Sequence, residues 1–154
     1  MAKAFKFRVE PVLKLRQEKE RLALKELADA RRRVAEVEDA IAHLRDELRE
    51  QDRQVREGVL TGSVDVEYMS LYRRHVMALH RRMIDQARRL QEATVYLDER
   101  RAEAVGAIEQ RKVLQTLKDK RKARYLHELE RAEGREQDDL TLMRVGHRRV
   151  EEAG

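Results

Sequence analysis

The sequence predicts an all-α fold, in which two long helices form an antiparallel coiled-coil hairpin and the second helix is longer and overhangs the first. Three observations predict this fold. Of the 154 residues, 90 are Ala, Glu, Lys, Leu or Arg, which are strong helix formers. Apolar residues recur every seven positions in two separate stretches, as they do in a coiled-coil seam. A short segment bounded by glycines separates these stretches.

The first helix is predicted over residues 11–57, after an N-terminal segment of residues 1–10. Pro11 is the only proline, and it suits the first turn of a helix because the N–H that it lacks is not needed there. The heptad pattern then defines one apolar face. The predicted seam residues of this helix are Leu13, Ala23, Leu27, Ala30, Val34, Val37, Ile41, Leu44, Leu48 and Val55.

A turn is predicted over residues 58–63, and the second helix over residues 64–133. Ser63 is the expected N-cap of the second helix, because a serine hydroxyl can accept a hydrogen bond from the first free N–H groups. Residues 134–154 lose the heptad period and are predicted to be a frayed or disordered tail of the single elongated domain. The predicted seam residues of the second helix are Met69, Tyr72, Val76, Leu79, Met83, Gln86, Leu90, Ala93, Leu97, Ala104 and Ala107.

The preferred register of the two antiparallel helices pairs large seam residues with small ones. Ala30 then lies opposite Leu90, and the charged layer becomes a matched pair of Glu20 and Arg100. A register shifted by one heptad places Arg100 against Leu27, which is less favourable. We therefore expect the first register, in which Phe5 and Phe7 lie near residues 113–117.

Composition excludes several classes of function. The chain has no cysteine, so disulfides, zinc–thiolate sites and thiol catalysis are excluded, and a reducing cytoplasm is the expected compartment. No apolar run approaches the roughly 20 residues that span a bilayer, so no membrane insertion is expected. His75 and His80 are five residues apart and lie on different helix faces, so no metal site is expected. A two-helix rod offers no enclosed cavity, so neither a cofactor nor enzymatic activity is expected.

The longer second helix leaves Leu114 and Leu117 near its unpaired end, followed by five basic residues and one acid in residues 118–124. Apolar residues without an intramolecular partner favour binding to another protein or to a second copy. A basic surface can also contact phosphates, but acids are interleaved along both helices, and the few aromatic residues form no platform for base stacking. No nucleic-acid partner is therefore expected. The alternatives are a basic coiled-coil arm that binds nucleic acid and a structural coiled-coil dimer.

Two end motifs resemble those of one protein family. Residues 5–16 read FKFRVEPVLKLR, and residues 111–118 read RKVLQTLK and continue through Arg121 to Tyr125. Both motifs, in this order and separation, resemble the FliJ family of the flagellar type III export apparatus. The resemblance covers nearly the whole chain, because the heptads and the turn between the motifs also fit.

The resemblance implies a non-enzymatic stalk of chaperone type, mostly monomeric when free, at the cytoplasmic face of the inner membrane. The partners that it implies are the ring of the export ATPase FliI, the linker of the export gate FlhA, and export chaperones. The candidate ATPase-binding residues are Phe5, Phe7, Leu114, Leu117, Lys118, Lys120, Arg121, Lys122, Arg124 and Tyr125. The candidate gate-binding residues are Tyr72, His75, Leu79, Arg82 and Gln86, of which only Leu79 matches the residue type of the family pattern.

Overall fold

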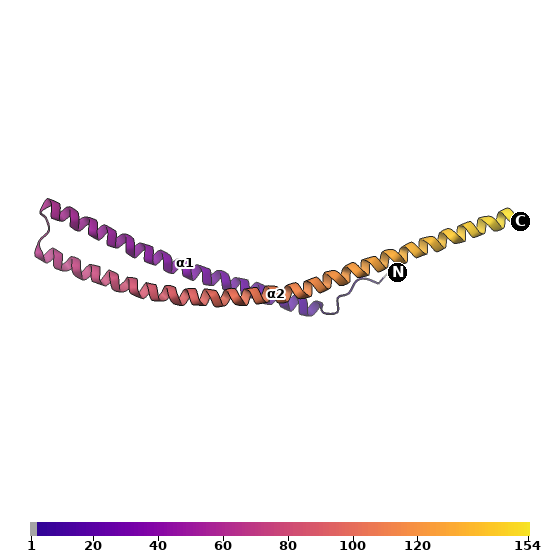
Figure 1. The fold of residues 1–154 in the computed structure, drawn as a ribbon, viewed down its shortest axis with the longest axis horizontal. Coiled ribbons are helices and arrows are strands. Elements are labelled where there is room, and N and C mark those ends of the chain that lie inside the picture. Colours follow the sequence, from indigo (N-terminus) through magenta and orange to yellow (C-terminus); the bar gives the residue numbers. More distant parts are fainter. Residues whose placement is uncertain (1–2) are drawn as a thin grey trace. The chain divides into compact units, whose positions relative to one another are not determined.

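The computed structural model describes residues 3–154 and confirms the helical hairpin. Helix α1 spans Glu10–Thr61 and helix α2 spans Val66–Ala153, and the described residues form no strand (Figure 1). Contacts divide the chain into two units. Unit 1 contains the residues up to Glu18 together with Ile108–Gly154, and unit 2 is Lys19–Ala107. Each unit takes a segment from both helices and is described separately.

The turn lies later in the chain than the sequence predicts. Helix α1 continues through Gly58 and stops at Gly62, whose φ of 71° is in the left-handed region that glycine adopts without strain. The N–H of Ser63 donates to the carbonyl oxygen of Gly58 at 2.9 Å, and that of Gly62 to Val59 at 3.3 Å, which is a Schellman ending. A side chain at Gly58 would collide with Val64, so this glycine permits close packing at the turn and does not break the helix.

Helix α2 differs from the prediction at both ends. Its N-cap is Asp65, whose carboxylate accepts a hydrogen bond from the Tyr68 N–H at 2.7 Å, and not Ser63. The predicted tail of residues 134–154 is not frayed, because α2 continues to Ala153. A helical glycine costs only about 1 kcal/mol relative to alanine, and the strong helix formers Glu133 and Arg135 flank Gly134. The loss of the heptad period instead marks the loss of a packing partner, since every residue from 135 onward is exposed.

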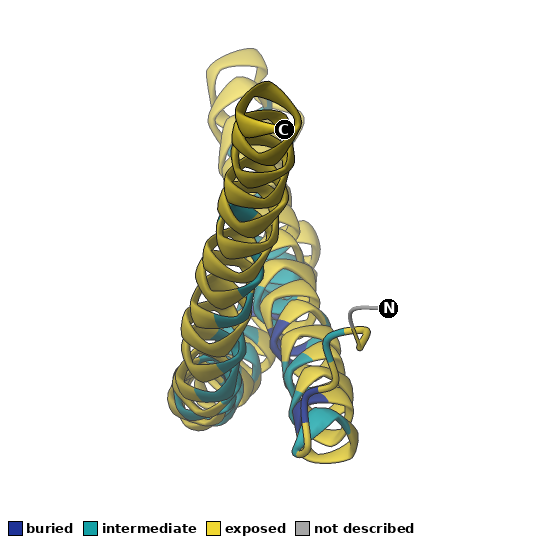
Figure 2. Ribbon diagram, turned by 90° about the vertical axis from the view of Figure 1, so that its right-hand side faces the viewer, coloured by how far each residue is buried: buried dark blue, intermediate teal, exposed yellow. Residues whose placement is uncertain are grey.

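The buried residues form a stripe only one side chain deep between the helices. In unit 2, Leu27, Ala30, Leu79 and Ala104 are buried, and the other predicted seam residues are half-buried. Figure 2 shows this stripe on the facing sides of the two helices, while the outward sides are exposed. The hydrophobic stabilisation of unit 2 therefore comes from a single row of layers, in which each large side chain contributes substantially.

Cross-helix contacts show that the expected register is wrong. Arg100 Nη1 pairs with Glu26 Oε2 at 3.1 Å, whereas the prediction placed it opposite Glu20. Glu26 lies six residues further along α1, so the helices are displaced by nearly one heptad. The cause is the later turn, because moving the midpoint of a hairpin by about three residues changes the register by about twice that number. The favoured assignment is thus the alternative register, with Arg100 near Leu27.

Arg100 is a charged side chain at a seam position of α2, where the heptad pattern otherwise places apolar residues. Besides Glu26, it binds Glu103 at 2.9 Å, and its guanidinium lies 5.0 Å from the centre of the Tyr96 ring. The hydrogen bond to Glu26 is the main reason why the pKa of Arg100 is raised, so the guanidinium stays charged. These partners satisfy the charge of a residue that the heptad pattern alone would make apolar.

Candidate partner-binding sites

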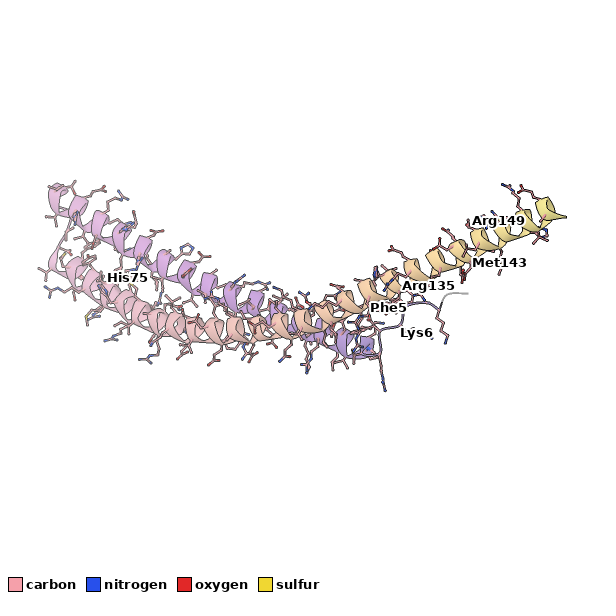
Figure 3. The ribbon with its side chains drawn as sticks, turned by 45° about the vertical axis from the view of Figure 1, so that its right-hand side comes forward. Phe5, Lys6, His75, Arg135, Met143 and Arg149 are labelled. Atoms are coloured by element: carbon pink, nitrogen blue, oxygen red, sulfur yellow. The ribbon has the colours of Figure 1, made fainter. Side chains whose placement is uncertain are left out.

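The N-terminal segment of unit 1 packs against the second half of α2. The Phe5 and Tyr125 rings lie 5.6 Å apart at an interplanar angle of 43°, and the Arg121 guanidinium lies 5.7 Å from the Phe7 ring centre. The Tyr125 hydroxyl donates a hydrogen bond to the Lys3 carbonyl oxygen. Figure 3 labels Phe5 beside α2. Four candidate ATPase-binding residues therefore contact one another in pairs and hold the segment in place.

These contacts lie further along α2 than expected. The sequence placed Phe5 and Phe7 near residues 113–117, but their ring partners are Tyr125 and Arg121. This displacement has the same direction as the register change in unit 2 and is larger by a few residues. Phe7 is only 8% exposed, so its first function is to anchor the segment.

A lysine from the candidate set also fixes the beginning of α1. Lys118 Nζ lies 2.9 Å from Glu10 Oε1 and 2.8 Å from Glu10 Oε2, and both side chains are partly buried. Glu10 is the first residue of α1, where a carboxylate is favoured by the positive end of the helix dipole. Arg16 donates to the Gln110 side chain nearby. Lys118 therefore stabilises unit 1 and is less available to a partner than the other lysines of the cluster.

The remaining candidates in this unit are free to contact a partner. Leu117, Lys120 and Arg124 are exposed, and their spacing of three and four residues places them on one face of α2. Lys122 is also exposed, and Leu114 is half-buried. The structure thus divides the candidate set into residues that anchor the N-terminal segment and a face of one leucine and two cations.

The candidate gate-binding segment lies in unit 2, where two of its polar residues bind α1. The Tyr72 hydroxyl donates a hydrogen bond to Asp52, and this bond raises the pKa of Tyr72 above its ordinary value. Nε2 of His75 lies 3.4 Å from Glu47 Oε1, and Figure 3 labels His75 on α2. Both side chains therefore connect the helices near the turn, and they are only partly available to another protein.

The other members of this set have different surroundings. Leu79 is 1% exposed and belongs to the seam, so it stabilises the hairpin. Gln86 is half-buried, whereas Arg82 is exposed. Arg82 and Gln86 lie along a shallow groove between the helices. The other residues that line this groove are Ala40, His43, Leu44, Asp85 and Arg89.

One hollow beside the turn was not predicted. Residues of the turn and of the first turns of α2 line it, and it is open to solvent. Its lining residues are Val59, Val64, Asp65, Val66, Met69, Ser70, Arg73, Arg74 and Met77. The sequence signal was the group of apolar residues in and after the turn, which a purely polar loop would not contain.

Within residues 3–154, no group of three or more His, Asp or Glu side chains is placed to hold a metal ion. In the same range, no helix has an apolar stretch that is long enough to cross a bilayer. The surface instead displays faces made of arginine, lysine and isolated apolar side chains.

Comparison with known protein families agrees with the resemblance of the end motifs. The family model described as flagellar FliJ protein matches residues 5–150, which is nearly the whole chain. No curated protein and no solved structure matches the chain significantly.

Proposed function

The chain belongs to the FliJ family of flagellar proteins, and from that premise we propose that it is the coiled-coil stalk that promotes assembly and activity of the export ATPase and links it to the membrane export gate. The family is a non-catalytic, coiled-coil component of flagellar export. Membership in the family does not by itself assign the roles toward the ATPase and the gate, and these roles are what we propose here. The observation that carries it is the contrast between a hairpin closed by one thin seam and an α2 end with no intramolecular cover.

Unit 1 supplies the proposed ATPase-binding surface. The N-terminal segment is fixed on α2 by Phe7 and by the Lys118–Glu10 pair, so the neighbouring side chains have defined positions. Leu117 and the cations on its face then offer one apolar contact within a positively charged rim. An interface with an apolar centre and a polar rim is the usual composition of protein–protein contacts.

Reversing the charge of Lys120, Lys122 and Arg124 to Glu is expected to reduce stimulation of the cognate export ATPase by on the order of tenfold or more, because reversed charges at an interface cost several kcal/mol. ATP hydrolysis is measured with and without the chain. The matched control reverses Arg45, Arg49 and Arg56, which are exposed on α1 in unit 2 and lie outside the candidate sites. Equal loss in both variants, or undiminished stimulation by the first, would contradict this surface.

The segment from Tyr72 to Gln86 is the proposed gate-binding region. Arg82→Glu is the sharpest probe, because Arg82 is exposed and Leu79 is needed for the seam. We expect about a tenfold weaker affinity for the cytoplasmic linker of the gate, with unchanged helicity. The affinity is measured by titration of the labelled linker, and Arg135→Glu is the control. Unchanged affinity in Arg82→Glu would count against this region.

In this proposal the free protein is mostly monomeric, acts at the cytoplasmic face of the inner membrane and also binds export chaperones. Sedimentation over a range of concentrations tests the first statement, since self-association through the exposed end of α2 would raise the apparent mass. Binding of duplex DNA or tRNA with a steep salt dependence would instead favour the nucleic-acid-binding alternative.

A further inference from the structure

One segment of α2 in unit 2 carries an unusual excess of arginine. Between Arg73 and Gln91 the sequence contains six arginines, and Asp85 is the only acid. The six are Arg73, Arg74, Arg81, Arg82, Arg88 and Arg89, and all are exposed. This charge is not spread evenly over the hairpin, because the whole chain has a net charge of only +5.

These six arginines have no ion-pair partner within the described range of residues 3–154. By contrast, two other arginines of unit 2 are paired with acids: Arg53 binds two glutamates, and Arg100 binds Glu26 and Glu103. Exposed arginines on a solvated coiled coil commonly alternate with acids at a spacing of three or four residues. The segment from Arg73 to Gln91 lacks that compensation.

Exposed apolar residues form a row on the outward side of α2. The row consists of Val66, Met77, Ile84 and Val95. Their successive spacings are 11, 7 and 11 residues. Because 11 residues make about three helical turns and 7 residues about two, all four lie in one row along the helix. Each is more than half exposed, from 55% for Val95 to 87% for Val66. The seam residues Tyr72, Leu79 and Gln86 lie on the other side of α2, so α1 does not cover this row.

Arg74, Arg81 and Arg88 run beside the apolar row at intervals of seven residues. Together with Met77 and Ile84 they form a surface that we name the arginine face. Their order is Arg74, Met77, Arg81, Ile84 and Arg88, with alternating spacings of three and four residues, which is the a/d spacing of a coiled-coil seam. The hollow beside the turn, which Arg74 and Met77 help to line, continues the face at one end.

The spacing favours a helical partner. A lipid bilayer or a nucleic-acid backbone attracts arginines but does not require them to recur every seven residues. A helix that packs along α2 meets the same face at each heptad, so the partner needs acids opposite the arginines and apolar residues opposite Met77 and Ile84. Aromatic residues for stacking bases are missing from the face.

We propose that the arginine face binds an acidic amphipathic helix of a protein partner, which packs along the outside of α2 as a third helix. The inference rests on the proposed function, because it gives the chemistry of a partner for the gate-binding region. Electrostatic attraction between the arginines and the acids speeds association, and the apolar row fixes the register.

The experiment uses the full chain and a fluorescent 21-residue helical peptide. The peptide carries Glu every seventh residue and Leu between them at the complementary spacing, and a scrambled isomer has the same composition. Anisotropy titrations give the affinities. Arg74→Glu/Arg81→Glu/Arg88→Glu is expected to weaken binding on the order of 100-fold, and Met77→Ser/Ile84→Ser by roughly tenfold. The matched control reverses Arg135, Arg148 and Arg149 on the exposed end of α2 and should bind like the unmodified chain. Figure 3 labels Arg135 and Arg149.

The proposal is overturned if the scrambled isomer binds as tightly as the ordered peptide, because the spacing would then be irrelevant. It is also overturned if phosphatidylglycerol vesicles or duplex DNA bind through the arginine face and the peptide does not. Stimulation of the export ATPase is measured on the same preparations. Stimulation without peptide binding removes only this inference, whereas peptide binding without any stimulation or gate binding removes the proposed function and leaves the surface in place.

Discussion

Leu79→Ala is expected to lower the free energy of unfolding by about 2–4 kcal/mol, within the range for buried leucines. Leu79 is 1% exposed and is one of the two largest fully buried side chains. Because the seam is one side chain deep, few neighbours can move to fill the space that the substitution leaves. Each kcal/mol corresponds to roughly 2–4 °C in melting temperature at this chain length. Thermal unfolding followed by circular dichroism at 222 nm measures the change.

The matched control is Leu71→Ala, because Leu71 is on the same helix and is 59% exposed. We expect a change within about 0.5 kcal/mol for this surface substitution. Equal melting temperatures for the two variants would show that burial of Leu79 in the seam does not stabilise the hairpin. The comparison also bears on gate binding, since a weaker affinity of Leu79→Ala would report the loss of the hairpin and not the loss of a direct contact.

A disulfide engineered between Ala30→Cys and Leu97→Cys is expected to form nearly completely, whereas Ala30→Cys with Leu90→Cys should remain reduced. The chain contains no natural cysteine, so each pair reports its own proximity. A disulfide requires Cα atoms within about 7 Å, and seven residues of helix correspond to about 10 Å. Mild oxidation and a non-reducing gel separate the two outcomes. Efficient closure of the second pair alone would restore the register in which Glu20 faces Arg100.

The helices and their seam were predictable because they depend on a repeated local pattern. Every predicted seam residue that the heptads selected, from Leu13 to Ala107, is buried or half-buried. The register was not predictable in the same way, since it depends on the position of one residue with a left-handed backbone. The sequence does not distinguish Gly58 from Gly62 as the residue that ends the helix. In the structure Gly62 has a positive φ and Gly58 does not.

The candidate sites were predictable as segments but not as sets of available side chains. Phe7 and Lys118 belong to the resemblance motifs, yet both are engaged within unit 1, by Arg121 and by Glu10. Such contacts join residues more than 100 positions apart, and their pairing follows from the register. The arginine face was not predictable as a binding surface, because its residues lie outside the seam, where charged residues usually form solvated flanks.

The exposed end of α2 has a consequence for amide hydrogen exchange. Helical hydrogen bonds in residues 135–153 have no side-chain layer above them, so local opening should require little free energy. Most of the stability of helices in proteins comes from tertiary packing, which this segment lacks. Its amides should therefore exchange with solvent far faster than those around Leu79, and a partner that covers this end should slow them selectively. Exchange protection in the last turns of α2 would then report occupancy directly, without any label on the partner.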